Sequence, residues 1–114
     1  MPMPEPYIPS KGDVVWLEFS PQAGHEQAGY RPALCISPKE YNKKVGLAIF
    51  CPITSQKKGY PFEVQLPDSI IEITGVILSD HVKNFDWKAR KAKYIYTLPT
   101  KLLNEVLGKL RTLL

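Results

Sequence analysis

One stretch of the chain, Gly24-His25-Glu26-Gln27-Ala28-Gly29-Tyr30-Arg31-Pro32, carries an unusual density of side chains that could do chemistry. It holds a carboxylate, an imidazole, an amide, a phenol and a guanidinium, and its apolar residues follow neither the helical nor the strand period. We therefore expect a loop. Loops on a rigid scaffold are where binding and catalytic residues concentrate, so we expect a site here.

A second polar segment, Thr54-Ser55-Gln56-Lys57-Lys58-Gly59-Tyr60-Pro61, follows an apolar run that reads as a strand. If that strand pairs antiparallel with the strand that follows the first loop, Arg31 and Thr54 reach the same end of the sheet. A permanent cation and a hydroxyl donor would then lie beside the carboxylate of Glu26. This combination suits phosphate, because a guanidinium presents a rigid fork of donors to phosphate oxygens.

The same residues would also suit a reaction at a phosphodiester. In-line attack on a phosphodiester builds negative charge on the nonbridging oxygens, which Arg31 and Thr54 could stabilise. An arginine hardly deprotonates near neutral pH, so Glu26 or His25 is the better candidate for accepting a proton. The residues leave open whether Glu26 accepts that proton or orients Arg31. We expect His25 and His81 to be solvent-facing or locally hydrogen-bonded rather than catalytic.

Composition narrows the class of protein. The 114 residues, 44% hydrophobic and 23% charged, predict a single globular domain. A net charge of +4 modestly favours a polyanionic partner such as nucleic acid. No apolar run approaches the roughly 18 residues of a membrane span and the N-terminus lacks the apolar region of a signal peptide, so we expect a cytoplasmic protein with no membrane partner. Cys35 and Cys51 lie in apolar runs without metal-ligand spacing, so we expect buried thiols and no metal site.

Short apolar runs separated by prolines and glycines predict a small β-barrel or a twisted sheet. Val15, Leu17 and Phe19 share one face of the first run and are expected in the core, and Pro52 is expected to end the pairing of the third. A proline-rich segment, 1–10, reads as an extended mobile arm before one domain, 11–114. The expected strands cover 14–19, 32–37, 47–53, 62–66, 75–79, 81–85 and 94–98.

The C-terminal segment changes period. After Pro99, leucines and valine recur at spacings of three and four residues, which predicts an amphipathic helix. Proline is well placed at a first helical turn, where its missing N–H would have no partner anyway. This helix either covers the barrel or mediates a dimer.

Several motifs occur in an order that matches a known family. They are Gly12-Asp13-Val14-Val15-Trp16-Leu17-Glu18-Phe19, the stretch from Gly24 to Ala33, Pro52-Ile53-Thr54-Ser55, the stretch from Lys58 to Val64, Asp80-His81-Val82-Lys83 and Trp87-Lys88-Ala89-Arg90. Over residues 11 to about 114 the chain thereby resembles the MazF/PemK family of toxin endoribonucleases. The resemblance implies a mainly β fold with a C-terminal α-helix, in a small SH3-like barrel of the CcdB/PemK-like kind. It also implies a homodimer, a small acidic antitoxin of the MazE type as partner, and no cofactor.

The activity that the resemblance implies is metal-independent, sequence-specific cleavage of single-stranded RNA, with mRNA as the expected substrate. In that reaction the ribose 2′-OH attacks its own phosphate and leaves a 2′,3′-cyclic phosphate and a 5′-OH. The family's functional arginine falls on Arg31, its threonine on Thr54 and its acidic loop residue on Glu26. The residues expected to contact RNA are Gln27, Tyr30, Ser55, Gln56, Lys57, Lys58, Tyr60, His81 and Lys83.

His81 stands where the family usually has glutamine, so base preference or pH dependence could differ in this chain. The alternative function is a non-catalytic SH3-like module that binds a peptide or nucleic acid, because a fold alone does not define an activity.

Overall fold

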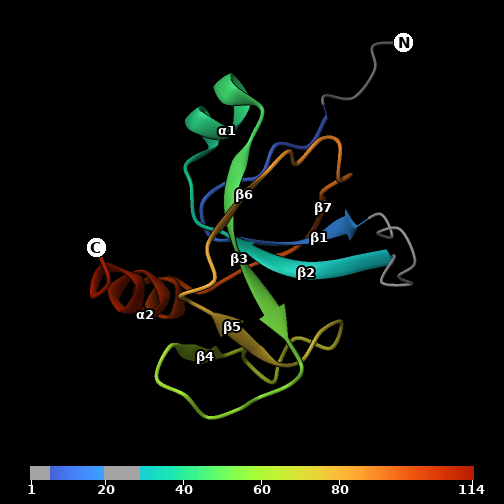
Figure 1. The fold of residues 1–114 in the computed structure, drawn as a ribbon. Coiled ribbons are helices and arrows are strands. Elements are labelled where there is room, and N and C mark those ends of the chain that lie inside the picture. The colour runs from blue at the N-terminus through green and yellow to red at the C-terminus, as the bar shows by residue number, and fades with distance from the viewer. Residues whose placement is uncertain (1–5, 20–28) are drawn as a thin grey trace, which may run out of the picture.

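The computed structural model describes residues 6–19 and 29–114. This part of the chain forms one antiparallel sheet and two α-helices (Figure 1). The elements in chain order are β1 (Asp13–Phe19), β2 (Gly29–Cys35), α1 (Lys39–Val45), β3 (Ala48–Thr54), β4 (Glu63–Gln65), β5 (Val76–Leu78), β6 (Lys83–Phe85), β7 (Lys93–Thr97) and α2 (Thr100–Arg111).

The sheet runs in the order β4-β5-β3-β2-β1-β7, with β6 also pairing with β3. Among the described residues this path starts at β4 and ends at β7, so the barrel is not closed by backbone pairing. The expected fold, mainly β in a single small domain with a C-terminal helix, is confirmed.

Strand β3 is the centre of the sheet because it has three partners. Its first residues pair with β6, its middle residues pair with β2, and its last two pair with β5. Pro52 lies opposite Ala33 in the last pair between β3 and β2, so the prediction that pairing stops at Pro52 is correct for β2, but it is wrong for the strand as a whole, because Ile53 and Thr54 pair with β5. Pairing instead passes from β2 to β5 at this point, which keeps the end of the strand in the sheet.

Strand β2 begins earlier than the sequence pattern indicates. Tyr30 and Arg31, expected in a loop, are paired with Glu18 and Leu17 of β1. The first three residues of β2 are exposed, which explains the error: an exposed strand end carries polar residues and shows no apolar alternation. Arg31 therefore projects from a hydrogen-bonded strand and not from a loop.

Two clusters of buried side chains form the core, and β1 contributes to both. We call them the helix-side cluster, which includes Val14, and the arm-side cluster, which includes Val15 and Leu17. Phe19 is only partly buried at the edge of the arm-side cluster, so the core face predicted for β1 ends at Leu17. The helix-side cluster comprises Val14, Leu34, Cys51, Ile53, Val64, Leu66, Ile70, Ile73, Ile77, Leu98 and Val106, and the arm-side cluster Val15, Leu17, Ala33, Cys35, Ala48, Phe50 and Trp87.

Helix α2 begins directly after Pro99 and covers the helix-side cluster. Val106 is fully buried there, and Leu102 and Leu103 pack beside it. The Lys109 ammonium donates to the carbonyl of Pro61, which ties the helix to the segment before β4. Of the two roles expected for this helix, covering the barrel is the one seen within the chain. No helix in the described residues has the length and apolar character to cross a membrane.

The residues just before β1 pack against the arm-side cluster. Tyr7 and Ile8 contact the cluster, and Pro9 is buried. The carbonyl of Pro9 accepts a hydrogen bond from Nδ2 of the buried Asn42 (2.7 Å), whose own carbonyl accepts one from Nε1 of Trp87 (3.0 Å). One buried asparagine thus joins three segments that lie far apart in the sequence.

Candidate active site

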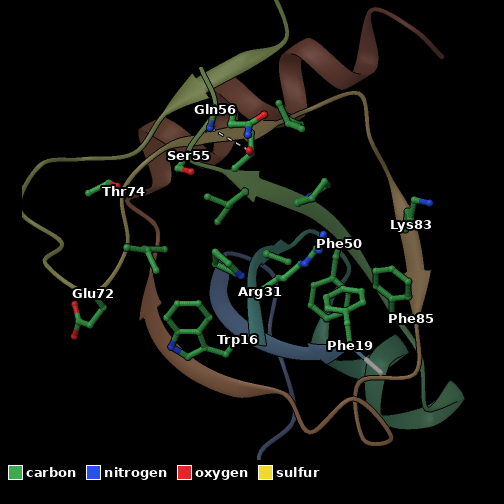
Figure 2. A pocket seen from close by; sticks show the side chains of 17 residues that line it. Trp16, Phe19, Arg31, Phe50, Ser55, Gln56, Glu72, Thr74, Lys83 and Phe85 are labelled. Carbon is green, nitrogen blue, oxygen red and sulfur yellow. Dashed lines mark hydrogen bonds between the residues drawn. The ribbon is translucent and has the colours of Figure 1, made fainter. Parts of the chain in front are cut away.

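A cavity of about 800 Å³ opens beside the ends of β2 and β3 and reaches β6 and the segment 72–74 (Figure 2). Both Arg31 and Thr54 line it, as the antiparallel pairing of β2 and β3 predicts. The lining residues are Trp16, Phe19, Arg31, Pro32, Ala33, Phe50, Pro52, Ile53, Thr54, Ser55, Gln56, Glu72, Ile73, Thr74, Leu78, Lys83 and Phe85.

The register of the sheet explains how Arg31 and Thr54 meet. Ala33 of β2 is paired with Pro52 of β3 in the last pair between these strands, and Arg31 and Thr54 each lie two residues beyond that pair, which is the side-chain period of a strand. Residues opposite each other in an antiparallel pair project to the same face. A guanidinium and a hydroxyl therefore enter the cavity from adjacent strands.

Arg31 lies among four aromatic side chains that line the cavity, Trp16, Phe19, Phe50 and Phe85, which we call the aromatic wall. Its Cζ atom is 5.7 Å from the centre of the Phe19 ring, within the range of a cation–π contact. Figure 2 shows Arg31 between Trp16 on one side and Phe19, Phe50 and Phe85 on the other. The side chain is exposed toward the opening, so it can reach a ligand while its position is restricted by the ring.

Thr54 is held at the last position of β3. Its backbone pairs with Val76 of β5, and its Oγ1 accepts a hydrogen bond from the backbone N–H of Gln56 (3.1 Å). Because that oxygen is used as an acceptor, its own O–H proton can point toward a bound ligand. Gly75 packs directly against the Thr54 carbonyl, where a Cβ atom on residue 75 would lie 2.1 Å from the oxygen.

Three rings of the aromatic wall, Trp16, Phe19 and Phe50, belong to the part of the cavity that the sequence patterns did not identify as functional. Phe19 and Phe85 meet edge to face at 5.6 Å between ring centres, and Phe85 also contacts Phe50 at 6.3 Å. The sequence pattern placed Phe19 in the core, and Trp16 was not among the residues expected at the site. One sequence signal was available for Phe19: it is the last residue of its strand, as Phe85 is of β6, and strand ends are where side chains leave the core.

A second, smaller cavity of about 310 Å³ shares Thr54 and Gln56 with the first. Lys58, Tyr60, Glu63, Leu78 and His81 complete its lining. The Tyr60 hydroxyl donates to Oδ1 of Asp80 (2.7 Å), and the same oxygen lies 3.8 Å from Nε2 of His81.

The environment of Tyr60 also fixes its protonation state. Desolvation and the hydrogen bond to the Asp80 carboxylate raise the pKa of Tyr60 to about 12. Its phenol is therefore protonated across the physiological pH range, as the hydrogen bond that it donates to Asp80 requires.

The structure brings most, but not all, of the residues expected to contact RNA to these cavities. Of the described ones, Tyr30 and Lys57 line neither of the two cavities: the Tyr30 ring lies 5.8 Å from the Lys93 ammonium, and the Lys57 ammonium donates to Gln65. Tyr30 differs from Arg31 because successive residues of a strand face opposite sides. Glu26 and Gln27, with His25, lie outside the described residues.

The charges of the first cavity favour an anion over a metal ion. Among the residues that the structure describes, Arg31 and Lys83 line it with a single carboxylate, Glu72. Within residues 6–19 and 29–114, no group of three or more His, Cys, Asp or Glu side chains could hold a metal ion.

Fold and site together define a small, mainly β protein that presents a guanidinium, a hydroxyl and an aromatic wall in one open cavity. The family described as "PemK-like, MazF-like toxin of type II toxin-antitoxin system" matches residues 10–114, and the chain belongs to this family of toxin endoribonucleases.

Individual relatives agree over nearly the whole chain. The Escherichia coli K12 endoribonuclease toxin MazF is 44% identical over 108 residues, which cover 95% of this chain and 96% of the relative. The Escherichia coli endoribonuclease PemK is 36% identical, covering 91% and 80% respectively. A crystal structure of MazE-MazF from Deinococcus radiodurans superposes with a TM-score of 0.88 at 51% identity, covering 94% of this chain and 96% of that one.

Proposed function

We propose that this protein is a toxin that cleaves single-stranded RNA by transesterification, with Arg31 and Thr54 as the groups that stabilise the transition state. The single observation that carries the assignment is that these two side chains line one cavity from adjacent strands. Family membership supports the endoribonuclease activity, and the cavity supports the choice of residues.

In the proposed reaction the ribose 2′-oxygen attacks the adjacent phosphorus, and the bond from phosphorus to the 5′-oxygen breaks. The 2′-OH proton leaves to a base, and the departing 5′-oxygen takes up a proton. Products are a 2′,3′-cyclic phosphate and a 5′-OH. Arg31 and the Thr54 hydroxyl donate to the nonbridging oxygens as their negative charge develops, which is a preorganised electrostatic contribution. No metal ion takes part in this scheme.

Glu26 has two alternative roles in this proposal. It either accepts the 2′-OH proton or forms an ion pair that orients Arg31. Arg31 itself is an unsuitable base because a guanidinium holds its proton at neutral pH. The pH dependence of the Glu26→Gln variant separates the two roles, because a general base leaves its pKa in the acidic limb of the rate profile.

Around the scissile phosphate, the two cavities offer places for unpaired bases. The aromatic wall provides flat apolar surface against which bases stack in single-stranded complexes. Ser55, Gln56, Tyr60 and His81 supply hydrogen-bonding groups for base edges, while Lys58 and Lys83 supply charge for the backbone. Gln27, Tyr30 and Lys57 are proposed as outer contacts of the same RNA.

The proposed partners follow from the relatives. A matching structure is described as a MazE-MazF complex, so we propose a small acidic antitoxin of the MazE type for this chain, and a homodimer as its free form. The net charge of +4 favours an acidic partner. A toxin acting on mRNA would work in the cytoplasm.

One assay tests the central proposal. Purified protein is incubated with a long RNA in EDTA, and the fragment ends are analysed. We expect discrete fragments with cyclic phosphate ends, and their loss with Arg31→Ala and Thr54→Ala variants of unchanged thermal stability. Wild-type cleavage by either variant would contradict the assignment, and RNA binding without cleavage by the wild type would favour the non-catalytic module.

A further inference from the structure

Arg90 occupies an unusual position next to the aromatic wall. Its Cζ atom lies 4.7 Å from the centre of the Phe19 ring and 4.4 Å from the centre of the Phe85 ring. Both distances are within the range of a cation–π contact. Arg90 therefore bridges the two rings that meet edge to face at the cavity, yet it is not itself one of the lining residues.

The backbone around Arg90 fixes its guanidinium in this place. The Arg90 carbonyl accepts a hydrogen bond from the N–H of Glu18 (2.7 Å), and the Arg90 N–H donates to the carbonyl of Asp86 (3.1 Å). The guanidinium also lies 3.5 Å from the Glu18 carbonyl oxygen. The turn after β6 is thus fastened to the end of β1, and the side chain is partly buried between them.

Arg31 contacts the same Phe19 ring, and this links Arg90 to the proposed chemistry. The Phe19 ring has the Arg31 guanidinium 5.7 Å from its centre and the Arg90 guanidinium at 4.7 Å. If the ring shifted or rotated, the surface that restricts Arg31 would move with it. A donor displaced by about 1 Å from its productive position costs up to roughly a hundredfold in rate.

We propose that Arg90 is a positioning residue that clamps Phe19 against Phe85 and thereby holds Arg31 in place for the reaction. This inference rests on the proposed function, since it assigns Arg90 an effect on the turnover of the same site. Arginine suits the role because its planar guanidinium stacks on aromatic faces, which the compact ammonium of lysine does less well.

The kinetic test compares Arg90→Met and Arg90→Lys with the wild type on a short single-stranded RNA. We expect kcat to fall about tenfold in Arg90→Met and about threefold in Arg90→Lys, with KM within about twofold of wild type, because Arg31 stays present but is less well aligned. Lys91→Met is the matched control: it removes one positive charge from the next residue, whose ammonium pairs with the exposed side of Glu18 at 3.6 Å. A loss of the same size in Lys91→Met would overturn the proposal.

A double-mutant cycle tests the route of the effect. In a Phe19→Leu background Arg90 has no Phe19 ring to hold in place. Arg90→Met should therefore lower kcat by less than about twofold further in this background. A full additional tenfold loss would show that Arg90 acts independently of Phe19 and would overturn the proposal. Thermal unfolding of each variant identifies any that fail to fold, and for those the comparison uses Arg90→Lys instead.

A measurement without RNA separates this inference from the proposed function. The Nε–Hε resonance of Arg31, assigned by its loss in Arg31→Lys, should shift in Arg90→Met and stay unchanged in Lys91→Met. If the wild type fails to cleave RNA but this shift occurs, the proposed function is wrong and the clamp stands. An unchanged Arg31 resonance in Arg90→Met overturns the clamp whatever the cleavage result.

Discussion

At the scale of single residues, the site depends on two donors of different character. Arg31 brings a permanent charge from an exposed strand end, and Thr54 brings a hydroxyl whose oxygen is held by the Gln56 N–H. The charge supplies attraction over a longer range, whereas the hydroxyl acts only at hydrogen-bond distance. Substitutions at the two positions should therefore have different kinetic signatures.

For Thr54, we expect Thr54→Val to lower kcat by about a hundred- to a thousandfold, the usual effect of removing one preorganised donor. Thr54→Ser keeps the hydroxyl and should retain activity within about tenfold. Single-turnover cleavage of a short RNA measures both. Activity near wild type in Thr54→Val, with a loss in Thr54→Ser, would show that the methyl group, and not the hydroxyl, is what the site requires.

For Arg31, the expected signature includes binding as well as turnover. Arg31→Lys retains the charge but loses the planar fork, so kcat should fall by about a hundredfold while affinity for an uncleavable RNA changes less than about threefold. Arg31→Gln should weaken both. Fluorescence anisotropy with a 2′-O-methyl RNA reports the affinity, and a rate near wild type in Arg31→Lys would contradict the donor role.

Tyr60 gives a prediction about stability against pH. Its phenol has a pKa of about 12 in the folded protein and an ordinary value of 10.0 when unfolded, so the folded state favours the protonated form. The stability that this adds is fully present below pH 10 and is lost as the pH rises toward 12.

The measurement is urea unfolding of the wild type and Tyr60→Phe at pH 8, 10 and 11. The stability of wild type relative to Tyr60→Phe should be constant between pH 8 and the onset of Tyr60 ionisation, then decline. Tyr96 and Cys51 also have raised pKa values, both about 12, but they are common to both proteins and cancel in the difference. A difference that grows with pH would contradict the assignment.

At the scale of elements, the strands were predictable and the ends of the strands were not. Runs of β-branched and aromatic residues located each strand to within a few residues, because burial on a pleated surface imposes that composition. The errors fall where a strand leaves the core: Arg31 lies in β2, Phe19 leaves the core face of β1, and β3 continues beyond Pro52. Residues at such ends line the site instead of the core, so they do not follow the apolar pattern from which strands are predicted.

The contact between β5 and β3 yields a test at the element scale. Gly75 has a φ of +130° and no room for a Cβ, which would lie 2.1 Å from the Thr54 carbonyl oxygen. Gly75→Ala should therefore push the end of β3 outward, destabilise the fold by roughly 2–4 kcal/mol and reduce cleavage in the molecules that stay folded.

The control for that substitution is Gly46→Ala at the end of α1. Gly46 also has a positive φ, +80°, but nothing lies within 4 Å of a Cβ there. The Gly46→Ala variant should lose only about 1–2 kcal/mol of folding stability, because alanine disfavours the left-handed backbone, and it should keep its specific activity. Chemical denaturation and activity per folded molecule compare the two, and equal losses would show that crowding of Thr54 is unimportant.

At the scale of the whole molecule, the order of motifs identified the family, while the convergence of groups on the site required three dimensions. Arg31 and Thr54 could be paired from sequence, because an antiparallel arrangement of two neighbouring strands was enough. Phe85 and Arg90 could not, since no local pattern indicates that the turn after β6 returns to the end of β1. The structure does not describe Glu26, so its role stays a prediction.

The distribution of charge predicts how RNA binding responds to salt. Arg31 and Lys83 line the first cavity and Lys58 the second, with Lys57 nearby. Three to four such contacts to phosphates predict a slope of about −2 to −3 for the logarithm of the association constant against the logarithm of salt concentration. Titrations of a 2′-O-methyl RNA at several salt concentrations measure this.

A matched pair of variants tests the same idea. Lys83→Met should reduce the magnitude of that slope by roughly 0.7, the value for one phosphate contact on a single strand. Lys43→Met, on the exposed face of α1, should leave it unchanged. A flat salt dependence of the wild type would remove the electrostatic contribution altogether.

The pairing of β1 with β7 has a consequence for how the protein comes into being. Strand β2, which carries Arg31, pairs with β1, and β1 pairs with β7 on its other edge. Strands β1 and β7 lie near opposite ends of the chain, so the sheet beneath Arg31 is complete only when both have been made. Synthesis proceeds from the N-terminus at roughly 5–20 residues per second. We expect the cavity to stay unformed until residue 97 has been made, so that nascent chains shorter than this lack the complete site.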